Sequence, residues 1–159
     1  MKYLRKFNES FKPMLDSNNV SDILVDIIDI GYKCNVETDW WSDGTNSIRV
    51  SIYGIYEFDK KYGCEIRYIY IDDVIESINR LFDYMKTESY LPSDVITKKN
   101  LEILNSNIDS LDLEKSGGKI PTGEKYSDGS YSSMTIKKDD NKNICKVETT
   151  ALEFNFKQG

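Results

Sequence analysis

Histidine is absent from this 159-residue chain. Catalysis by a Ser-His-Asp triad or a Cys-His pair uses an imidazole as the general base, so the sequence excludes both in their usual form. The same absence excludes H-E-x-x-H metalloproteases and zinc deaminases, in which histidine binds the metal. General acid–base chemistry would have to use carboxylates, Lys, Tyr or Cys. We therefore expect a protein that is not an enzyme and that holds no cofactor.

Cysteine is scarce, with only Cys34, Cys64 and Cys145 in the chain. Their number is odd, their spacings are long, and no C-x-x-C pair occurs, so they predict neither a disulfide framework nor a zinc site. All three lie in strand-like runs, where a free cysteine is usually a small buried hydrophobe. This pattern predicts a reducing compartment, the cytoplasm.

Long hydrophobic runs are also missing. No stretch approaches the roughly 18 apolar residues of a transmembrane helix, and the basic N-terminus lacks the apolar segment of a signal peptide. The net charge is −6, whereas nucleic-acid binding requires clustered Lys and Arg. We expect no membrane and no nucleic-acid partner. A protein partner remains, and the chain could also form a homo-oligomer.

The length favours one domain, and apolar residues three and four positions apart predict two amphipathic helices. These helices cover residues 20–30 and 73–86. Gly31 is the expected C-terminal cap of the first helix, because glycine adopts the left-handed conformation at no steric cost. Glu76 and Arg80 have the spacing of an ion pair within the second helix.

Alternating apolar and polar residues predict three strands between the two helices. The strands cover residues 33–41, 48–58 and 64–71. Connections this short allow only antiparallel neighbours. The predicted class is therefore α+β, with residues 17–91 forming an antiparallel three-stranded meander flanked by two helices in the order α-β-β-β-α.

Residues 92–159 are expected to extend the same domain. Their composition predicts a helix over 93–104, a glycine-rich loop over 115–130, and a hairpin with strands at 131–138 and 144–156. The sequence leaves open whether this hairpin extends the meander or forms a separate lobe.

Two motifs that carry chemistry are incomplete. The glycine-rich loop has the outer spacing of a phosphate-binding loop, but Glu124 stands where its lysine belongs and would repel a phosphate. A carboxylate nuclease would need an Asp on one strand and E-x-K on the next. Glu65 and Arg67 follow Asp59, but an arginine replaces the lysine.

The second face of the predicted sheet is the best candidate for a binding surface. It mixes aromatic, aliphatic and arginine side chains, and Tyr and Arg are enriched at the cores of protein interfaces. The candidate residues are Trp41, Arg49, Tyr53, Arg67 and Ile69. The alternative is that residues 93–156 cover this face.

Residues 1–16 read as a leader segment. Leu4, Phe7 and Phe11 fall at helical spacing with basic residues between them, and Pro13 ends any helix. The segment is too short to fold alone, so it either packs on its own domain or docks on a partner. Leu4, Phe7 and Phe11 are its candidate contacts.

The opening Met-Lys-Tyr-Leu-Arg-Lys-Phe-Asn-Glu-Ser resembles the short leader of many small uncharacterised proteins of tailed bacteriophages. It is also similar to the leader that sends internal head proteins into the prohead of T4-like phages, where a maturation protease cuts after a hydrophobic-x-Glu triplet. Phe7 and Glu9 would place the cut after Glu9, although that family has Leu or Ile where Phe7 stands. The resemblance implies a phage origin.

The leading hypothesis is a small non-enzymatic accessory protein that binds another protein in the host cytoplasm. The alternatives are a virion component packaged through its leader, and a carboxylate-dependent metal enzyme.

Overall fold

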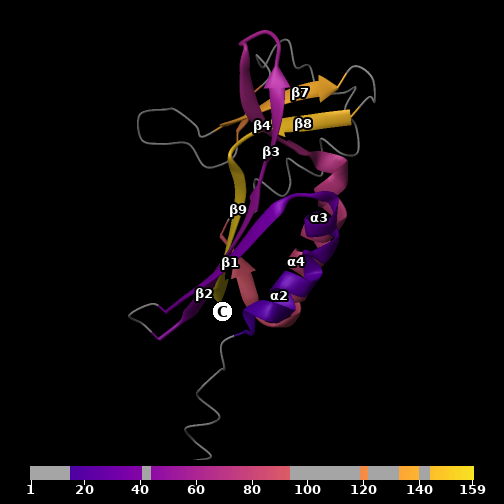
Figure 1. The fold of residues 1–159 in the computed structure, drawn as a ribbon. Coiled ribbons are helices and arrows are strands. Elements are labelled where there is room, and N and C mark those ends of the chain that lie inside the picture. The colour runs from indigo at the N-terminus through magenta and orange to yellow at the C-terminus, as the bar shows by residue number, and fades with distance from the viewer. Residues whose placement is uncertain (1–14, 41–43, 94–118, 122–132, 140–143) are drawn as a thin grey trace, which may run out of the picture.

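The structure is a computed structural model, and it describes residues 15–40, 44–93, 119–121, 133–139 and 144–159 (Figure 1). These residues form three helices and nine strands, which confirms the α+β class. In chain order the elements are α2 (Ser17–Ile23), α3 (Val25–Ile30), β1 (Lys33–Trp40), β2 (Asn46–Tyr53), β3 (Ile55–Asp59), β4 (Cys64–Tyr70), α4 (Ile71–Thr87), β5 (Tyr90–Pro92), β6 (Lys119–Pro121), β7 (Ser133–Asp139), β8 (Ile144–Glu148) and β9 (Ala151–Gln158).

The strands form two antiparallel sheets rather than the predicted meander. The first sheet has the order β1-β2-β9-β5, and the second has the order β3-β4-β8-β7-β6. The predicted strand over residues 48–58 is divided at Gly54, where the chain leaves the first sheet as β2 and enters the second as β3. In the sequence, apolar and polar residues continue to alternate through Gly54. The alternation therefore does not reveal that the chain changes sheet there.

The C-terminal strand is divided in the same way. Residues 144–156 were expected to be continuous, but β8 ends at Glu148 in the second sheet and β9 begins at Ala151 in the first. Because β9 lies between β2 and β5, the C-terminal extension is part of both sheets. This placement answers the question that the sequence left open.

The two crossings are hydrogen-bonded to each other. The backbone N–H of Gly54 donates to the carbonyl of Thr150 at 3.0 Å, and that of Thr149 donates to the carbonyl of Arg67 at 3.1 Å. A Cβ on Gly54 would lie only 2.7 Å from the carbonyl oxygen of Thr149 and 3.1 Å from the Cβ of Arg67. Gly54 therefore permits the close backbone approach on which the junction depends.

The change of sheet also changes which side chains are exposed. The uninterrupted strand placed Tyr56 and Phe58 on the buried face with Ile52, but their exposed fractions are 60% and 65%. Ile55 instead packs partly buried against the core. The alternation is intact within each strand, but the face that meets the core differs between β2 and β3.

The first predicted helix is present as two short helices that meet at Leu24. Leu24 has no exposed surface and belongs to the core with Val20 and Ile27. The side chain of Asp16 accepts a hydrogen bond from the N–H of Asn18 and caps α2. Gly31, with a φ of 119°, ends α3 in the left-handed conformation, as predicted.

Helix α4 provides one side of the main core, and the helices lie along one side of the first sheet in Figure 1. The ring of Phe82 makes edge contacts with Phe154 and Phe156 of β9, at centroid distances of 5.5 and 5.0 Å. The expected pair of Arg80 with Glu76 is not the one that forms. Arg80 contacts Asp26 of α3 at 2.6 Å, because the packing of α4 on α3 brings that carboxylate closer.

A tight turn joins β3 and β4 in the short connection that the sequence predicts between residues 58 and 64. Asp59 accepts hydrogen bonds from the backbone N–H groups of Lys61 and Tyr62, and Gly63 has a φ of 65°. This is the side-chain chemistry that favours Asp and Gly in turns.

Two short strands were not predicted. Within the expected loop over 115–130, Lys119–Pro121 pairs with β7, and Tyr90–Pro92 pairs with β9. Three-residue segments are too short to show alternation. The expected helix over 93–104 and the leader segment lie outside the described residues. In the described part of the chain, no helix is long and apolar enough to cross a membrane.

Candidate binding groove

A groove of about 780 Å³ lies in the corner where β1 begins and β2 passes into β3. The groove forms because the two sheets diverge at Gly54. This divergence leaves the start of β1 beside β3, the strand that enters the second sheet. The residues that line it are Gly31, Lys33, Cys34, Asn35, Tyr53, Gly54, Ile55, Tyr56 and Arg67.

Tyr56 and Arg67 contact each other on the groove. They are directly paired across β3 and β4, and Arg67 donates a hydrogen bond to the hydroxyl of Tyr56 through Nη2. The guanidinium carbon also lies 4.4 Å from the centroid of the Tyr56 ring, which is a cation–π contact. These contacts hold an exposed aromatic ring in one orientation.

The groove is positively charged although the chain is acidic. Lys33 and Arg67 are its two cations, and no carboxylate is among the described residues that line it. Among the described residues, neither groove cation forms an ion pair, whereas Arg49 pairs with Glu37, Arg80 with Asp26 and Lys146 with Glu57.

Arg67 also borders a second hollow of about 550 Å³, on which Glu65 and Glu148 lie. This hollow is lined in addition by Tyr56, Ile66, Thr149 and Thr150. The lining of this hollow therefore includes carboxylates, whereas that of the groove does not.

The structure brings together two of the predicted binding residues. Tyr53 and Arg67 both line the groove, although they belong to different sheets. Arg49 lies outside the groove lining and contacts Glu37 at 3.6 Å and Asn155 at 3.2 Å. Trp41 and the leader contacts Leu4, Phe7 and Phe11 lie outside the described residues.

The prediction for Ile69 is wrong, because this side chain has no exposed surface. It is paired with Val147 of β8, and both belong to the same core cluster as the buried side chains of α4. The sequence analysis placed Ile69 beside Arg67 from the alternation of β4. It did not show that the end of this strand is covered where it leads into the helix.

Sequence reasoning missed Lys33, Asn35 and Tyr56. Tyr56 was assigned to the buried face because the strand was followed through Gly54. The glycine in the middle of an otherwise strong strand was the available signal, since such a residue often marks a bend or a close approach of backbone.

Cys34 lies on the groove but is a poor nucleophile. Burial raises the pKa of the Cys34 thiol to about 11, so the thiol is protonated near pH 7. Cys64, in contrast, is exposed at the start of β4, which is not the buried position expected for it. The side chain of Cys145 is outside the described residues.

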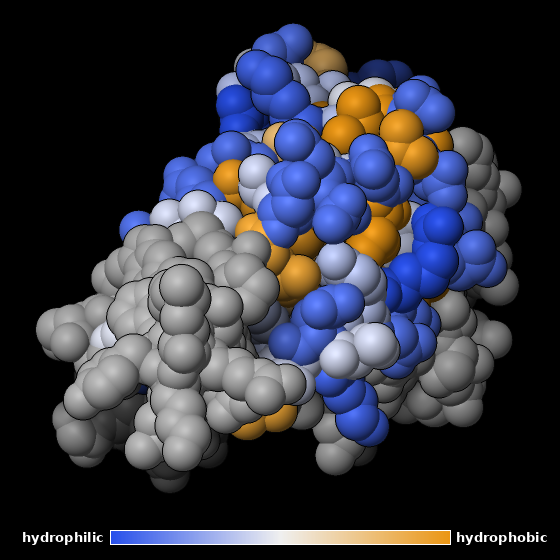
Figure 2. Space-filling view, turned by 90° about the horizontal axis from the view of Figure 1, so that it is seen from below, coloured by the Kyte–Doolittle hydropathy of each residue, from blue (hydrophilic) through white to orange (hydrophobic). Residues whose placement is uncertain are grey.

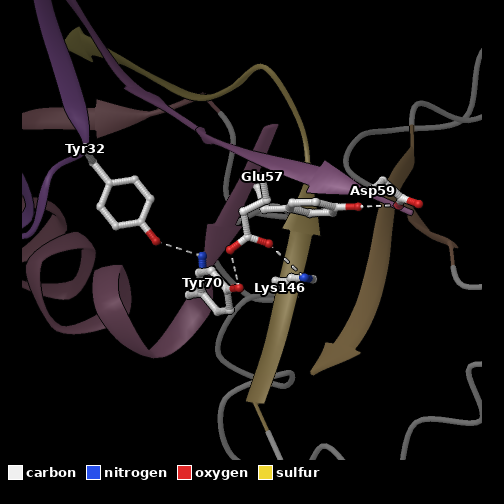
Figure 3. Close-up of polar contacts among 6 residues, drawn as sticks. Tyr32, Glu57, Asp59, Tyr70 and Lys146 are labelled. Atoms are coloured by element: carbon white, nitrogen blue, oxygen red, sulfur yellow. Dashed lines mark hydrogen bonds and ion pairs between the residues drawn. The ribbon is translucent and has the colours of Figure 1, made fainter. Parts of the chain in front are cut away.

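A separate polar cluster occupies one face of β3, β4 and β8 (Figure 3). Glu57 accepts a hydrogen bond from the hydroxyl of Tyr70 and pairs with Lys146 at 3.0 Å. The ammonium of Lys146 lies 4.3 Å from the centroid of the Tyr68 ring, and the Tyr68 hydroxyl donates to Asp59 at 3.0 Å. These contacts join side chains of three strands.

Tyr32 links the same region to the start of α4. Its buried hydroxyl accepts a hydrogen bond from the N–H of Tyr70 at 3.0 Å and donates one to Asp73 at 2.8 Å (Figure 3 shows the first). Burial raises the pKa of Tyr32, so the hydroxyl stays protonated as the second bond requires.

Two carboxylates outside the groove have structural contacts. Asp59 caps its turn, and Asp26 pairs with Arg80. Among the residues that the structure describes, no group of three or more Cys, Asp or Glu side chains is arranged to hold a metal ion.

Exposed apolar side chains also occur away from the groove. In Figure 2, hydrophobic residues reach the surface in separate areas between hydrophilic ones. The exposed large hydrophobic side chains include three from α3 and one from β5: Val25, Ile28, Ile30 and Leu91.

No family model, no curated protein and no solved structure matches this chain.

Proposed function

We propose that this chain is a small non-enzymatic accessory protein, of the kind that tailed phages encode, and that it binds another protein in the host cytoplasm through the groove. The observation that supports the site is the combination of Tyr53, Tyr56 and Arg67 on one concave surface. The phage origin rests on the resemblance of the leader, and the cytoplasm on the pattern of cysteines.

The physical properties of Tyr56 suit recognition. Its ring is 60% exposed and is held by the hydrogen bond and the cation–π contact with Arg67. An aromatic side chain that is already fixed loses little conformational entropy when a partner covers it. Tyr and Arg are also the residue types that dominate binding energy at interfaces.

Affinity capture from host cells tests this function. The tag is placed at the C-terminus and the leader is kept intact. Three single variants, Tyr53→Ala, Tyr56→Ala and Arg67→Ala, are compared with wild type and with the matched control Arg49→Ala, an exposed arginine outside the groove. We expect one dominant partner that the control retains and the groove variants lose. A partner retained equally by all four variants would show that the groove is not the site.

The leader supports a second candidate, a virion component, because the Phe7-Asn8-Glu9 triplet is similar to the cleavage motif of packaged head proteins. Mass spectrometry of purified particles tests it. Particles that contain the chain with Ser10 as its first residue would support packaging, and particles without the chain would exclude it.

A further inference from the structure

The edge strands of the two sheets differ in how well they are protected. Among the described strands, β5 and β6 are edges of three residues, and each ends in a proline, Pro92 or Pro121. Short edges and prolines prevent another strand from pairing. The outward side of β1 carries only polar and charged residues, namely Lys33, Asn35, Glu37 and Asp39, which protect an edge in the same way.

Strand β3 is the least protected of these edges. It has five residues, lies at the end of its sheet and exposes Tyr56 and Phe58 at 60% and 65%. An edge with exposed aromatic side chains and no proline is a template for the addition of an extended segment.

The groove lies at the start of this edge. Ile55 and Tyr56 of β3 form part of its lining, and Lys33 and Asn35 at the start of β1 form another part. Since Lys33 is paired with Tyr53 at the end of β2, β1 begins where β3 departs. No described strand lies beside the outer edge of β3, in line with β1.

The charge of the groove limits what can bind there. Lys33 and Arg67 have no ion pair among the described residues, and the chain as a whole carries a net charge of −6. The groove cations would repel a basic segment. The acidic surface elsewhere on the chain would also attract such a segment away from the groove. An acidic segment would satisfy both cations.

We infer that the partner contributes an extended, acidic segment that pairs as an additional strand with β3. Tyr56 and Phe58 share a face of the sheet with Arg67, so the segment presents both kinds of side chain on that face. Its carboxylates lie against Lys33 and Arg67, and its apolar side chains pack on the two rings. This inference rests on the proposed function, because it names the kind of segment that the groove recognises.

A displayed library of random 12-residue peptides provides the first test. The library is selected on the intact protein and counter-selected on Arg67→Glu, with Arg49→Glu as the matched control. We expect enriched peptides in which acidic and β-branched or aromatic residues occur together at every second position, so that both kinds share one face, and that bind Arg49→Glu like wild type. Enrichment of basic or uncharged peptides would overturn the inference, and so would a selection without enrichment.

Backbone pairing is tested with the enriched peptide itself. It is synthesised in two forms, N-methylated at alternate residues on one edge or on the other. A paired strand loses at least about tenfold in affinity when the edge that faces β3 is methylated and little when the other edge is methylated. Equal loss in both forms would overturn strand addition. Amide chemical shifts report the place, with changes expected in β3 and at residues 33–35.

Failure of this inference can be told apart from failure of the proposed function. If capture depends on Tyr53 and Arg67 but no acidic peptide is enriched, the groove binds a protein and the segment chemistry is wrong. If the peptide binds yet capture yields no groove-dependent partner, the proposed function is wrong. A mass that doubles with concentration and returns to the monomer in a Phe58→Lys variant would assign the edge to a second copy and overturn the inference.

Discussion

The carbonyl oxygen of Thr149 lies 2.7 Å from the position that a Cβ on Gly54 would occupy. This contact joins the two points at which the chain changes sheet, and the groove exists because the sheets diverge there. The backbone bond from Gly54 to Thr150 closes the same junction at 3.0 Å.

Replacing Gly54 with alanine is therefore expected to destabilise the fold. The nearest atom is the backbone oxygen of Thr149, which cannot move aside as the end of a flexible side chain can, and overpacking of this kind costs about 1–3 kcal/mol. Urea unfolding of Gly54→Ala gives the free energy of unfolding. Thr150→Ala is the control, since its exposed side chain is removed while its carbonyl remains. Equal stability of the two variants would contradict the close contact.

The hydroxyl of Tyr32 is expected to stabilise the junction between β4 and α4. Tyr32→Phe leaves the N–H of Tyr70 and the carboxylate of Asp73 without this partner, and an unsatisfied buried group costs about 1–3 kcal/mol. Tyr84→Phe serves as the control, on a half-buried tyrosine of α4. Calorimetric melting compares the two, and a Tyr32→Phe variant as stable as the control would refute this role.

The ion pair of Glu57 with Lys146 is expected to be worth more than that of Asp26 with Arg80. The first pair has side chains that are 30% and 17% exposed, whereas those of the second are 62% and 54% exposed. Exposed pairs contribute about 0–1 kcal/mol because water screens them. Double-mutant cycles to alanine measure both coupling energies. A larger coupling for Asp26 with Arg80 would contradict the assignment of Glu57 to a buried cluster.

Cys34 predicts how stability changes in alkali. The unfolded thiol loses its proton near pH 9, while the folded thiol keeps its proton up to about pH 11 because burial raises its pKa. The unfolded state then binds fewer protons, so stability falls as the pH rises through this window. The raised pKa of Tyr32 acts in the same direction. Cys34→Ala should make the decline shallower between pH 8 and 11, and parallel curves for the two proteins would contradict the burial of the thiol.

The same burial predicts unequal alkylation. Cys64 is exposed and Cys34 is half-buried, so iodoacetamide is expected to modify Cys64 first at pH 8. Peptide mapping by mass spectrometry follows each cysteine separately. Faster modification of Cys34 would show that the groove opens more widely than its lining indicates.

Much of the local structure could be predicted from the sequence. The apolar spacing of α4, the alternation of β1 and β4 and the turn between Asp59 and Gly63 each depend on neighbouring residues, and all are found. The two changes of sheet could not be predicted in this way. They depend on contacts between Gly54 and the Thr149–Thr150 segment, which lies almost a hundred residues further along the chain.

In the candidate site too, some residues could be predicted from local patterns and others could not. Tyr53 and Arg67 were found because their types and alternation favour a surface, and both line the groove. Ile69 was wrong and Tyr56 was missed because burial depends on which sheet face meets α4. The face that meets α4 changes where the strands separate at Gly54, so the alternation of neighbouring residues does not determine it.

Photo-crosslinking in host cells tests the central claim, that the groove binds a protein, most directly. The photoreactive residue p-benzoylphenylalanine replaces Tyr56 in one protein and Lys86, an exposed residue of α4, in another. We expect a crosslink to one dominant host protein from position 56 and none to that protein from position 86. The same product from both positions, or none from position 56, would contradict it.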